Sequence, residues 1–352
     1  MHLPLAKNKV IPVTTISKIK ELRKKHISED LLIKGIFNGD KAILAKAITL
    51  LESSKPEHYE KSNTIIEQAL SKPNKSIRIG ITGVPGVGKS SFIEVLGKTL
   101  TKMGKKVAVL AVDPTSTLSK GSILGDKTRM ESLAKDPNAF IRPSPSGQSL
   151  GGVARKTRES IILCEAAGFD VILVETVGVG QSETVVHSMV DFFLLLKLSG
   201  AGDELQGIKR GIMEMADAIA INKADGDNLK KAKLAETEFT RALHLYPPKE
   251  NGWIPKVLSC SAIENKGIIE IWEMIIDFIL QNQENGHFKK KRKIQNKNWF
   301  LQTIDEQLKM FFHQKESFKK AKEKMIKAVE ENKVSPFYAA KSLMDDIIKE
   351  LK

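Results

Sequence analysis

Cysteine is scarce in this sequence: only Cys164 and Cys260 occur among 352 residues. Both lie beside apolar segments, so we expect two reduced, buried thiols rather than a disulfide or a metal site. The seven histidines are scattered, and no two have the spacing of metal ligands. A zinc or nickel centre built from histidine and cysteine is therefore not expected.

Long apolar runs are also missing. No run approaches the roughly 20 residues that a helix needs to cross a bilayer, so we expect no membrane partner. The first residues, MHLPLAKNKVIPVTT, are basic but lack the continuous apolar segment of a secretory signal. They contain no arginine, which argues against a mitochondrial transit peptide. We therefore expect a cytoplasmic protein.

Acidic residues are outnumbered: 42 Asp and Glu stand against 56 Lys and Arg, a formal net charge of +14. Such an excess raises the hypothesis of a nucleic-acid partner. The lysines are spread along the chain, apart from one dense run at 287–299, HFKKKRKIQNKNW. We interpret this run as a solvated helix face or a basic linker and expect no nucleic-acid partner. The rival interpretation, a nucleic-acid-binding tail, predicts binding that falls steeply with added salt.

The residue pattern divides the chain into three regions. Residues 1–75 have apolar residues at helical spacing and end in the turn-rich SKPNKS, which predicts an N-terminal helical segment. Residues 76–281 alternate short apolar runs with amphipathic helices. Residues 282–352 form a lysine-rich helical region whose apolar stripes need a partner surface. Packing on the same chain and pairing with a second subunit both remain open for these stripes.

The middle region predicts an α/β fold with a mostly parallel sheet and helices on both faces. Strands that are apolar throughout and separated by helices are typical of such a sheet. Its ligands bind beyond the carboxyl ends of the strands. The candidate strands are SIRIGIT, KVAVLAVD, AFIR, DVILVE, FFLLLKL, AIAIN and KVLSC.

The segment GVPGVGKS matches the phosphate-loop pattern G-x-x-x-x-G-K-[ST]. It follows a candidate strand and opens a candidate helix, which is the context that the pattern requires. Glycines let the backbone N–H groups wrap a polyphosphate, and the helix points its positive end at the same anion. Lys89 can reach the β- and γ-phosphates, and the Ser90 hydroxyl can bind Mg²⁺. This motif predicts a P-loop NTPase, with nucleotide contacts from Gly83, Val84, Pro85, Gly86, Val87, Gly88, Lys89, Ser90 and Ser91.

NKAD, which ends the strand AIAI, is the candidate purine site. Asp225 can accept hydrogen bonds from the ring N–H and the exocyclic amine of guanine, a pair that adenine lacks. Lys223 can lie along the base face, and Asn222 completes the motif. Backbone N–H groups at Ser261, Ala262 and Ile263, in SCSAIE, are candidates to meet guanine O6. These residues predict GTP and GDP as ligands.

The stretch VETVGVGQSE provides a second phosphate-side element. Glu175 lies at a strand end, where it can act on the water shell of Mg²⁺. The Gly178 N–H can reach the γ-phosphate, and loss of that phosphate would release the loop, as in a switch. A purely structural acid is the alternative for Glu175.

Two further polar loops carry candidate acids. Asp113 follows the strand VAVLAV, where it can orient the attacking water or hold a water ligand of Mg²⁺. Asp126 is either another metal-side acid or the cap of the following helix. In GAGDELQGIKRGI, the residues Asp203, Glu204 and Lys209 can form salt bridges with nucleotide or partner, or belong to a solvated loop.

Together these motifs resemble the MeaB/ArgK/MMAA family of P-loop GTPases, of the SIMIBI class. The resemblance covers all but roughly the first 25 residues, by the extent of the matching motifs along the chain. It rests on segments that occur in the family's order: GITGVPGVGKSSFI, AVDPTSTLSKGSILGDKTRM, RPSPSGQSLGGVARKTRE, ILVETVGVGQSE, LSGAGDELQGIKRGIMEMAD, NKADGDN and SCSAIENKGI.

The resemblance implies a GTP-hydrolysing chaperone that assists and protects an adenosylcobalamin-dependent acyl-CoA mutase and gates its cofactor loading. It implies Mg²⁺ as cofactor, held by Ser90, Asp113, Asp126 and Glu175, with Lys89, Asp113 and Glu175 as catalytic residues. It also implies that GAGDELQGIK couples to the mutase as a third switch, and that residues 282–352 form the arm of a homodimer. Whether a cobalamin adenosyltransferase joins the complex is left open.

Two other hydrolases stay as rivals: a metallochaperone GTPase, and a transport-associated (LAO/AO, ArgK-like) nucleotide hydrolase. The first would need a histidine tract or paired cysteines, which the sequence lacks. The second would accept ATP. No arginine is clearly placed as a catalytic finger, with Arg155 and Arg158 only candidates, so we expect slow hydrolysis that a partner accelerates.

Overall fold

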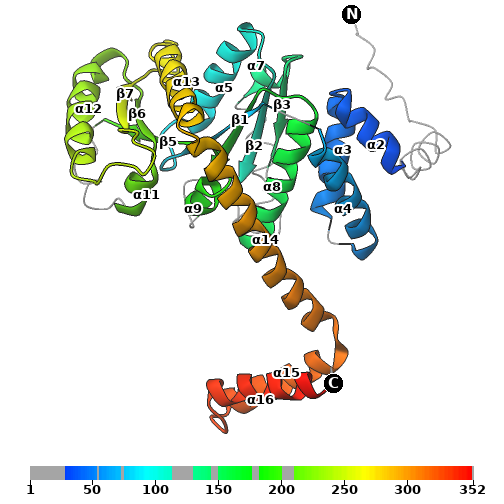
Figure 1. Ribbon diagram of the computed structural model, residues 1–352. Helices are drawn as coiled ribbons and strands as arrows, with labels where there is room; N and C mark the ends of the chain where they lie inside the picture. Colours follow the sequence, from blue (N-terminus) through cyan, green and yellow to red (C-terminus); the bar gives the residue numbers. More distant parts are fainter. Residues whose placement is uncertain are drawn as a thin grey trace, which may run out of the picture. The chain divides into compact units, whose positions relative to one another are not determined.

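A computed structural model describes residues 28–53, 55–72, 75–112, 130–143, 150–176, 182–199 and 210–350. Two compact units follow one another along the chain, Met1–Asn285 and Gly286–Lys352. The first unit contains a seven-stranded sheet and the helices around it (Figure 1). The second contains helices only.

The sheet has the strand order β3-β2-β4-β1-β5-β6-β7, and every pairing between neighbours is parallel. This confirms the predicted α/β class, and all seven candidate strands occur. The β-branched and leucine-rich runs of the central strands β1, β2, β4, β5 and β6 are buried on both faces over most of their length, whereas the edge strands β3 and β7 are only partly buried. The strands are β1 (Ile77–Thr82), β2 (Val107–Val112), β3 (Ala139–Arg142), β4 (Val171–Thr176), β5 (Phe192–Leu198), β6 (Ala218–Asn222) and β7 (Lys256–Ser259).

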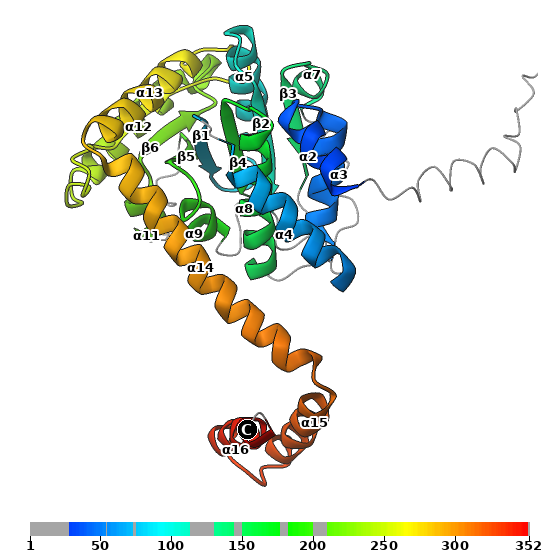
Figure 2. The ribbon, with the colours of Figure 1, turned by 45° about the vertical axis from the view of Figure 1, so that its right-hand side comes forward.

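Helices cover the sheet in two groups, as Figures 1 and 2 show. In one group α5 (Lys89–Lys102) contacts α13 (Ile268–Glu284). In the other, α9 (Ser182–His187) contacts both α8 (Leu150–Ala166) and α11 (Arg210–Met215). The apolar faces of these helices and the sheet residues beneath them form the core, which holds the strand ends in place.

The helix α12 (Leu229–Leu243) packs over β6 and β7. Its buried Ala232, Ala235 and Phe239 meet Ile219 and Ile221 of β6 in one apolar cluster. This packing fixes the helix that follows the predicted purine motif. Short elements complete this unit: α7 (Glu131–Ala134) and the 3₁₀ turn η1 (Gly226–Asn228).

The N-terminal helical segment consists of α2 (Glu29–Phe37), α3 (Lys41–Glu52) and α4 (Pro56–Leu70), which contact α8. Gly39 has φ +74° and ends the first helix, where a left-handed backbone favours glycine. Asp40 then caps α3, accepting from the N–H groups of Ala42 and Ile43 at 2.8 and 3.0 Å. These contacts make the segment part of the same compact unit as the sheet.

The second unit consists of α14 (His287–Gln314), α15 (Glu316–Glu330) and α16 (Pro336–Glu350). The basic run 287–299 lies within α14, so it is a helix rather than a linker. Contacts join α15 to both α14 and α16. Within the part of the chain that the structure describes, no helix is long and apolar enough to cross a membrane.

Candidate functional site

The site lies where the parallel strands end. Because every pairing is parallel, the carboxyl ends of β1, β4, β5, β6 and β7 meet at one edge of the sheet. β1 lies between β4 and β5 in the sheet. The crossover from β1 leads to β2 on one side, and the crossover from β4 leads to β5 on the other, so the two run in opposite directions. Such a switch point is where ligands of open α/β sheets bind.

The phosphate loop, residues 83–90, depends on glycines with positive φ. Gly83, Gly86 and Gly88 have φ of +154°, +82° and +93°. A Cβ on Gly83 would lie 2.6 Å from the Leu196 carbonyl oxygen, so close approach to β5 also requires glycine there. Gly88 directly precedes α5, which starts at Lys89 and aims its N-terminus into the loop.

Lys89 is buried, and its Nζ donates to the carbonyl oxygens of Gly83 at 2.8 Å and Val84 at 3.3 Å. Burial lowers the pKa of Lys89, since desolvation penalises the ammonium. The carboxylates of Glu175 and Glu183 oppose that shift in pKa. The loop thus holds a cation beside two acids.

Glu175 and Ser90 come together from separate elements. The Ser90 Oγ donates to the Glu175 Oε1 at 3.3 Å, across 85 residues of sequence. Glu175 belongs to β4, where it is buried, and its neighbour Thr176 donates to Thr82 of β1 at 2.8 Å. The tips of β1 and β4 are therefore bonded to each other, and a hydroxyl and a carboxylate face one place. Oxygen ligands of this kind suit Mg²⁺.

The purine loop, residues 222–225, is bonded directly to the phosphate loop. Asn222 Nδ2 donates to the Val87 carbonyl oxygen at 2.8 Å, and Lys223 Nζ donates to that of Gly86 at 2.8 Å. A Cβ on Gly88 would lie 2.7 Å from Asn222 Nδ2, so this approach leaves no space for a side chain. The two predicted halves of the site are thus side by side.

Asp225 and Ser261 form the far side of the purine loop. The Ser261 Oγ donates to Asp225 Oδ2 at 2.5 Å, and the Ala224 N–H donates to the Cys260 carbonyl oxygen at 2.9 Å. The Ser261 N–H donates to the Lys266 carbonyl oxygen at 2.9 Å, so of the three backbone groups expected near guanine O6 it is engaged within its own loop. Ala262 is buried and Ile263 is exposed.

Six candidate residues lie outside the described residues: Asp113, Asp126, Gly178, Asp203, Glu204 and Lys209. The two finger candidates are on α8: Arg155 Nε donates to Glu159 at 2.8 Å, and Arg158 donates to Ser188 Oγ at 2.7 Å.

Sequence reasoning missed three residues of the site. Glu183 is a buried acid in α9, and its charge acts on Lys89. Ser199 Oγ donates to Asn228 Oδ1 at 2.6 Å, and Asn228 Nδ2 in turn donates to the Lys223 carbonyl oxygen of the purine loop. Glu183, Ser199 and Asn228 all lie in segments quoted above, VETVGVGQSE, LSGAGDELQGIKRGIMEMAD and NKADGDN. What no segment indicates by itself is that Ser199, after β5, and Asn228, after β6, are bonded to each other.

The cysteine prediction is confirmed, because Cys164 and Cys260 are both buried and not joined in a disulfide. Burial raises the pKa of the Cys260 thiol to about 12 and that of Cys164 further. Neither thiol is therefore a nucleophile.

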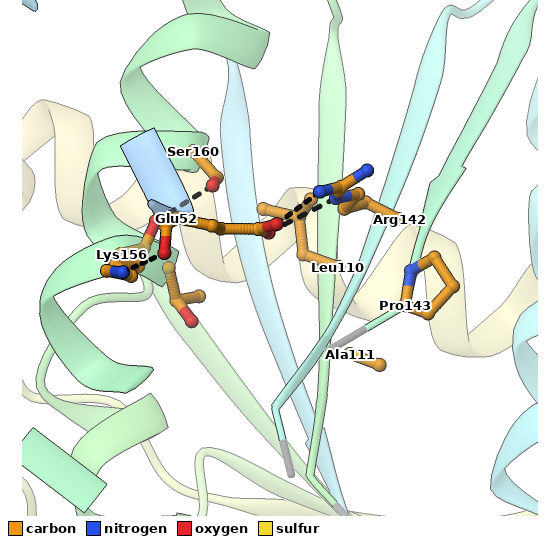
Figure 3. A pocket seen from close by; sticks show the side chains of 8 residues that line it. Glu52, Leu110, Ala111, Arg142, Pro143, Lys156 and Ser160 are labelled. Carbon is orange, nitrogen blue, oxygen red and sulfur yellow. Dashed lines mark hydrogen bonds and ion pairs between the residues drawn. The ribbon is translucent and has the colours of Figure 1, made fainter. Parts of the chain in front are cut away.

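A small hollow lies beside the ends of β2 and β3 (Figure 3). Its polar wall is an ion pair between Glu52 of α3 and Arg142 of β3, with Lys156 Nζ donating to the Glu52 carbonyl oxygen. Burial lowers the pKa of Lys156. The charged groups satisfy one another, so this cluster ties the N-terminal helices to the sheet and is not a second site.

The comparison with known families identifies the chain. Residues 44–317 match the family described as methylmalonyl Co-A mutase-associated GTPase MeaB. The chain belongs to the MeaB family. It is accordingly a P-loop GTPase, and the expected family resemblance is confirmed.

Relatives in the MeaB family span most of the chain. GTPase ArgK of Escherichia coli is 45% identical over 315 residues, covering 90% of this chain and 95% of its own. The mouse protein named "Methylmalonic aciduria type A homolog, mitochondrial" is 44% identical over 325 residues, which cover 90% and 78% of the two chains. A crystal structure titled LAO/AO transport system kinase has a TM-score of 0.71 at 40% identity, covering 92% of this chain and 99% of that one.

Proposed function

We propose that this MeaB-family GTPase binds the triphosphate of GTP in the phosphate loop and its guanine at the purine loop. The observation that carries the proposal is the direct bonding of the two loops, Asn222 to Val87 and Lys223 to Gly86, each at 2.8 Å. Two motifs more than 130 residues apart in sequence thereby share one edge of the sheet. A single nucleotide can span them.

Asp225 selects the base in this proposal. Its Oδ2 is held by Ser261 at 2.5 Å, which orients the carboxylate toward the base position. The ring N–H and exocyclic amine of guanine both donate to a carboxylate, whereas adenine would leave it unpaired. The exposed stem of Lys223 covers the base face, and the N–H groups of Ala262 and Ile263 meet O6.

Lys89 stabilises the negative charge that develops during hydrolysis. Its Nζ lies on the carbonyl oxygens of Gly83 and Val84, at the mouth of the cradle where the β- and γ-phosphates bind. As negative charge develops on the phosphoryl oxygens, a buried ammonium stabilises it more than water would. The carboxylates of Glu175 and Glu183 favour the protonated form of that lysine and oppose the lowering of its pKa by burial.

Ser90 and Glu175 fit a Mg²⁺ site, because a hydroxyl and a buried carboxylate already face each other at 3.3 Å. When bound, Mg²⁺ would neutralise charge on the β- and γ-phosphates. Asp113 and Asp126 are proposed as further acids on this side, with Asp113 orienting the attacking water. Gly178 is proposed to sense the γ-phosphate.

The family match supports a client as well. We propose that GTP binding and hydrolysis gate cofactor loading of an adenosylcobalamin-dependent acyl-CoA mutase and protect it. In this proposal Asp203, Glu204 and Lys209 couple the nucleotide to the mutase. A cobalamin adenosyltransferase is a candidate third member of the complex.

The test compares GTP hydrolysis by the protein alone with hydrolysis in the presence of methylmalonyl-CoA mutase. Because Arg155 donates to Glu159 and Arg158 donates to Ser188, we expect slow turnover alone and at least about tenfold stimulation by the client. ATP in tenfold excess should leave the rate unchanged. Equal rates with and without mutase contradict the client, and competition by ATP contradicts the guanine site.

A pull-down from the native lysate, with a non-hydrolysable GTP analogue, would then identify the client. Methylmalonyl-CoA, isobutyryl-CoA and ethylmalonyl-CoA mutases are the alternatives. Capture that is equal with GDP would contradict a nucleotide-gated complex.

A further inference from the structure

We infer that Asn228 is a positioning residue for nucleotide binding, which holds the purine loop in its binding conformation with the help of Ser199. Neither residue belongs to the NKAD motif or the phosphate loop. The inference rests on the proposed assignment of residues 222–225 to the base. It concerns affinity for the nucleotide rather than the chemical step.

The purine loop needs an unusual backbone. Lys223 has φ +59°, a left-handed conformation that a residue with a side chain adopts at a cost. This turn lets Asn222 face the phosphate loop while Asp225, three residues on, faces Ser261. Such a conformation persists only where surrounding contacts enforce it.

Asn228 provides one of these contacts. Its Nδ2 donates to the Lys223 carbonyl oxygen at 2.6 Å. The N–H of the same peptide unit, that of Ala224, donates to the Cys260 carbonyl oxygen at 2.9 Å. Both ends of the peptide between Lys223 and Ala224 are therefore bonded, and Asn228 is the side chain that fixes one end.

Ser199 fixes the orientation of the Asn228 amide. Its Oγ donates to Asn228 Oδ1 at 2.6 Å, which leaves the Nδ2 pointing to the Lys223 carbonyl. A flipped amide would set two acceptors against each other. Ser199 directly follows β5, and Leu198 pairs with Asn222 in the sheet register, so the sheet itself places this donor.

The arrangement predicts that Asn228→Ala weakens GDP and a non-hydrolysable GTP analogue by the same factor, about five- to tenfold. The factors are equal because both ligands carry the same base. The KM for GTP rises by that factor, while kcat, the rate at saturating GTP, stays within about twofold. The melting temperature of the nucleotide-free protein stays within about 2 °C, since a half-buried side chain is removed.

Two further variants separate the hydrogen bond that the Asn228 amide donates from the packing of its side chain. Asn228→Asp keeps an acceptor for Ser199 but sets a carboxylate against the Lys223 carbonyl, so its affinity falls at least as far as that of Asn228→Ala. Ser199→Ala weakens GDP by about two- to threefold, and adding it to Asn228→Ala causes no further loss. Asn63→Ala, an exposed asparagine of α4, is the matched control.

Isothermal titration with GDP and Mg²⁺ decides the matter. Wild-type affinity in Asn228→Ala or Asn228→Asp overturns the inference, as does a loss of kcat at unchanged KM. Should either Asn228 variant fail to fold, Ser199→Ala decides, and unchanged GDP affinity there is equally adverse. If the wild-type protein binds no guanine nucleotide, it is the proposed function that has failed.

Discussion

Replacing Asp225 by asparagine can keep the hydrogen bond from Ser261 while it changes the hydrogen bonds to the base. Its Oδ2 accepts from Ser261 at 2.5 Å, and an asparagine oxygen can accept the same bond. The other side of the group would then be an amide N–H₂, which donates. Substitution of Asp225 alone therefore tests which base the site selects.

Asp225→Asn should weaken GTP by about 100-fold or more and favour xanthosine triphosphate, whose extra oxygen accepts from the new amide. Titration of both nucleotides measures the reversal. Asp227→Asn, an exposed neighbour in η1, is the control and should bind GTP as the wild type does. Unchanged GTP affinity in Asp225→Asn would contradict the assignment.

Lys89 makes the free energy of unfolding depend on pH, because burial lowers its pKa. Between its folded pKa and 10.5 the unfolded chain binds more protons at this lysine than the folded chain. The free energy of unfolding therefore gains a term that rises with pH in that window. Below the folded pKa the buried ammonium costs stability in full.

Lys89→Met should remove both this term and hydrolysis, the latter by at least about 100-fold. We expect the unfolding free energy of the wild type, relative to the variant, to increase as pH rises toward 10.5. Urea unfolding of nucleotide-free protein at several pH values measures the difference. A difference that is flat or falls with pH would show that Lys89 is not desolvated.

At the scale of elements, the phosphate loop is a strand–turn–helix unit whose shape depends on where β5 runs. Gly83 has φ +154° and faces the Leu196 carbonyl oxygen, with a Cβ distance of 2.6 Å. Gly104, after α5, has φ +80° and open space around it. An alanine at position 104 would add backbone strain alone, whereas an alanine at position 83 would add steric overlap with Leu196 as well.

Gly104→Ala should lower the free energy of unfolding by about 1 kcal/mol, the cost of a left-handed alanine. Gly83→Ala should cost about 3 kcal/mol or more, because backbone atoms cannot move aside as a side chain can. Urea unfolding of both variants, with GDP titration, makes the comparison. Equal losses in the two variants would contradict the close packing of the loop on β5.

At the scale of the whole molecule, residues 286–352 form a unit with its own apolar stripe. Leu301, Ile304, Leu308 and Phe311 follow one another at spacings of three and four residues along α14, and 48%, 37%, 51% and 46% of each is exposed. Such a spacing forms a seam that pairs with another helix. We propose that a second copy of the chain covers it and that the protein is a homodimer.

Leu301→Lys combined with Leu308→Lys should convert this dimer into a monomer, since buried lysines oppose pairing. Sedimentation at about 10 µM measures the change, because the equilibrium depends on concentration. Leu245→Lys, at a residue 87% exposed in the first unit, should stay dimeric. A wild-type chain that sediments as a monomer would remove the proposal.

The strands, the main helices and the phosphate and purine motifs were accessible from the sequence. Runs such as VILVE and FFLLLKL must be buried on both faces, and GVPGVGKS carries its own turn and helix start. The helical spacing of apolar residues in 1–75 predicts helices but not where each one ends, and the structure shows that Gly39 and Asp40 separate α2 from α3.

Only the fold decides which of these groups touch. Glu175 meets Ser90, Asn222 meets Val87, and Asn228 meets Ser199 because parallel strands distant in sequence end at one edge. Periodicity and motifs describe neighbours along the chain. The contacts that shape this site depend on strand order and on the left-handed turn at Lys223, which follow from packing the whole sheet.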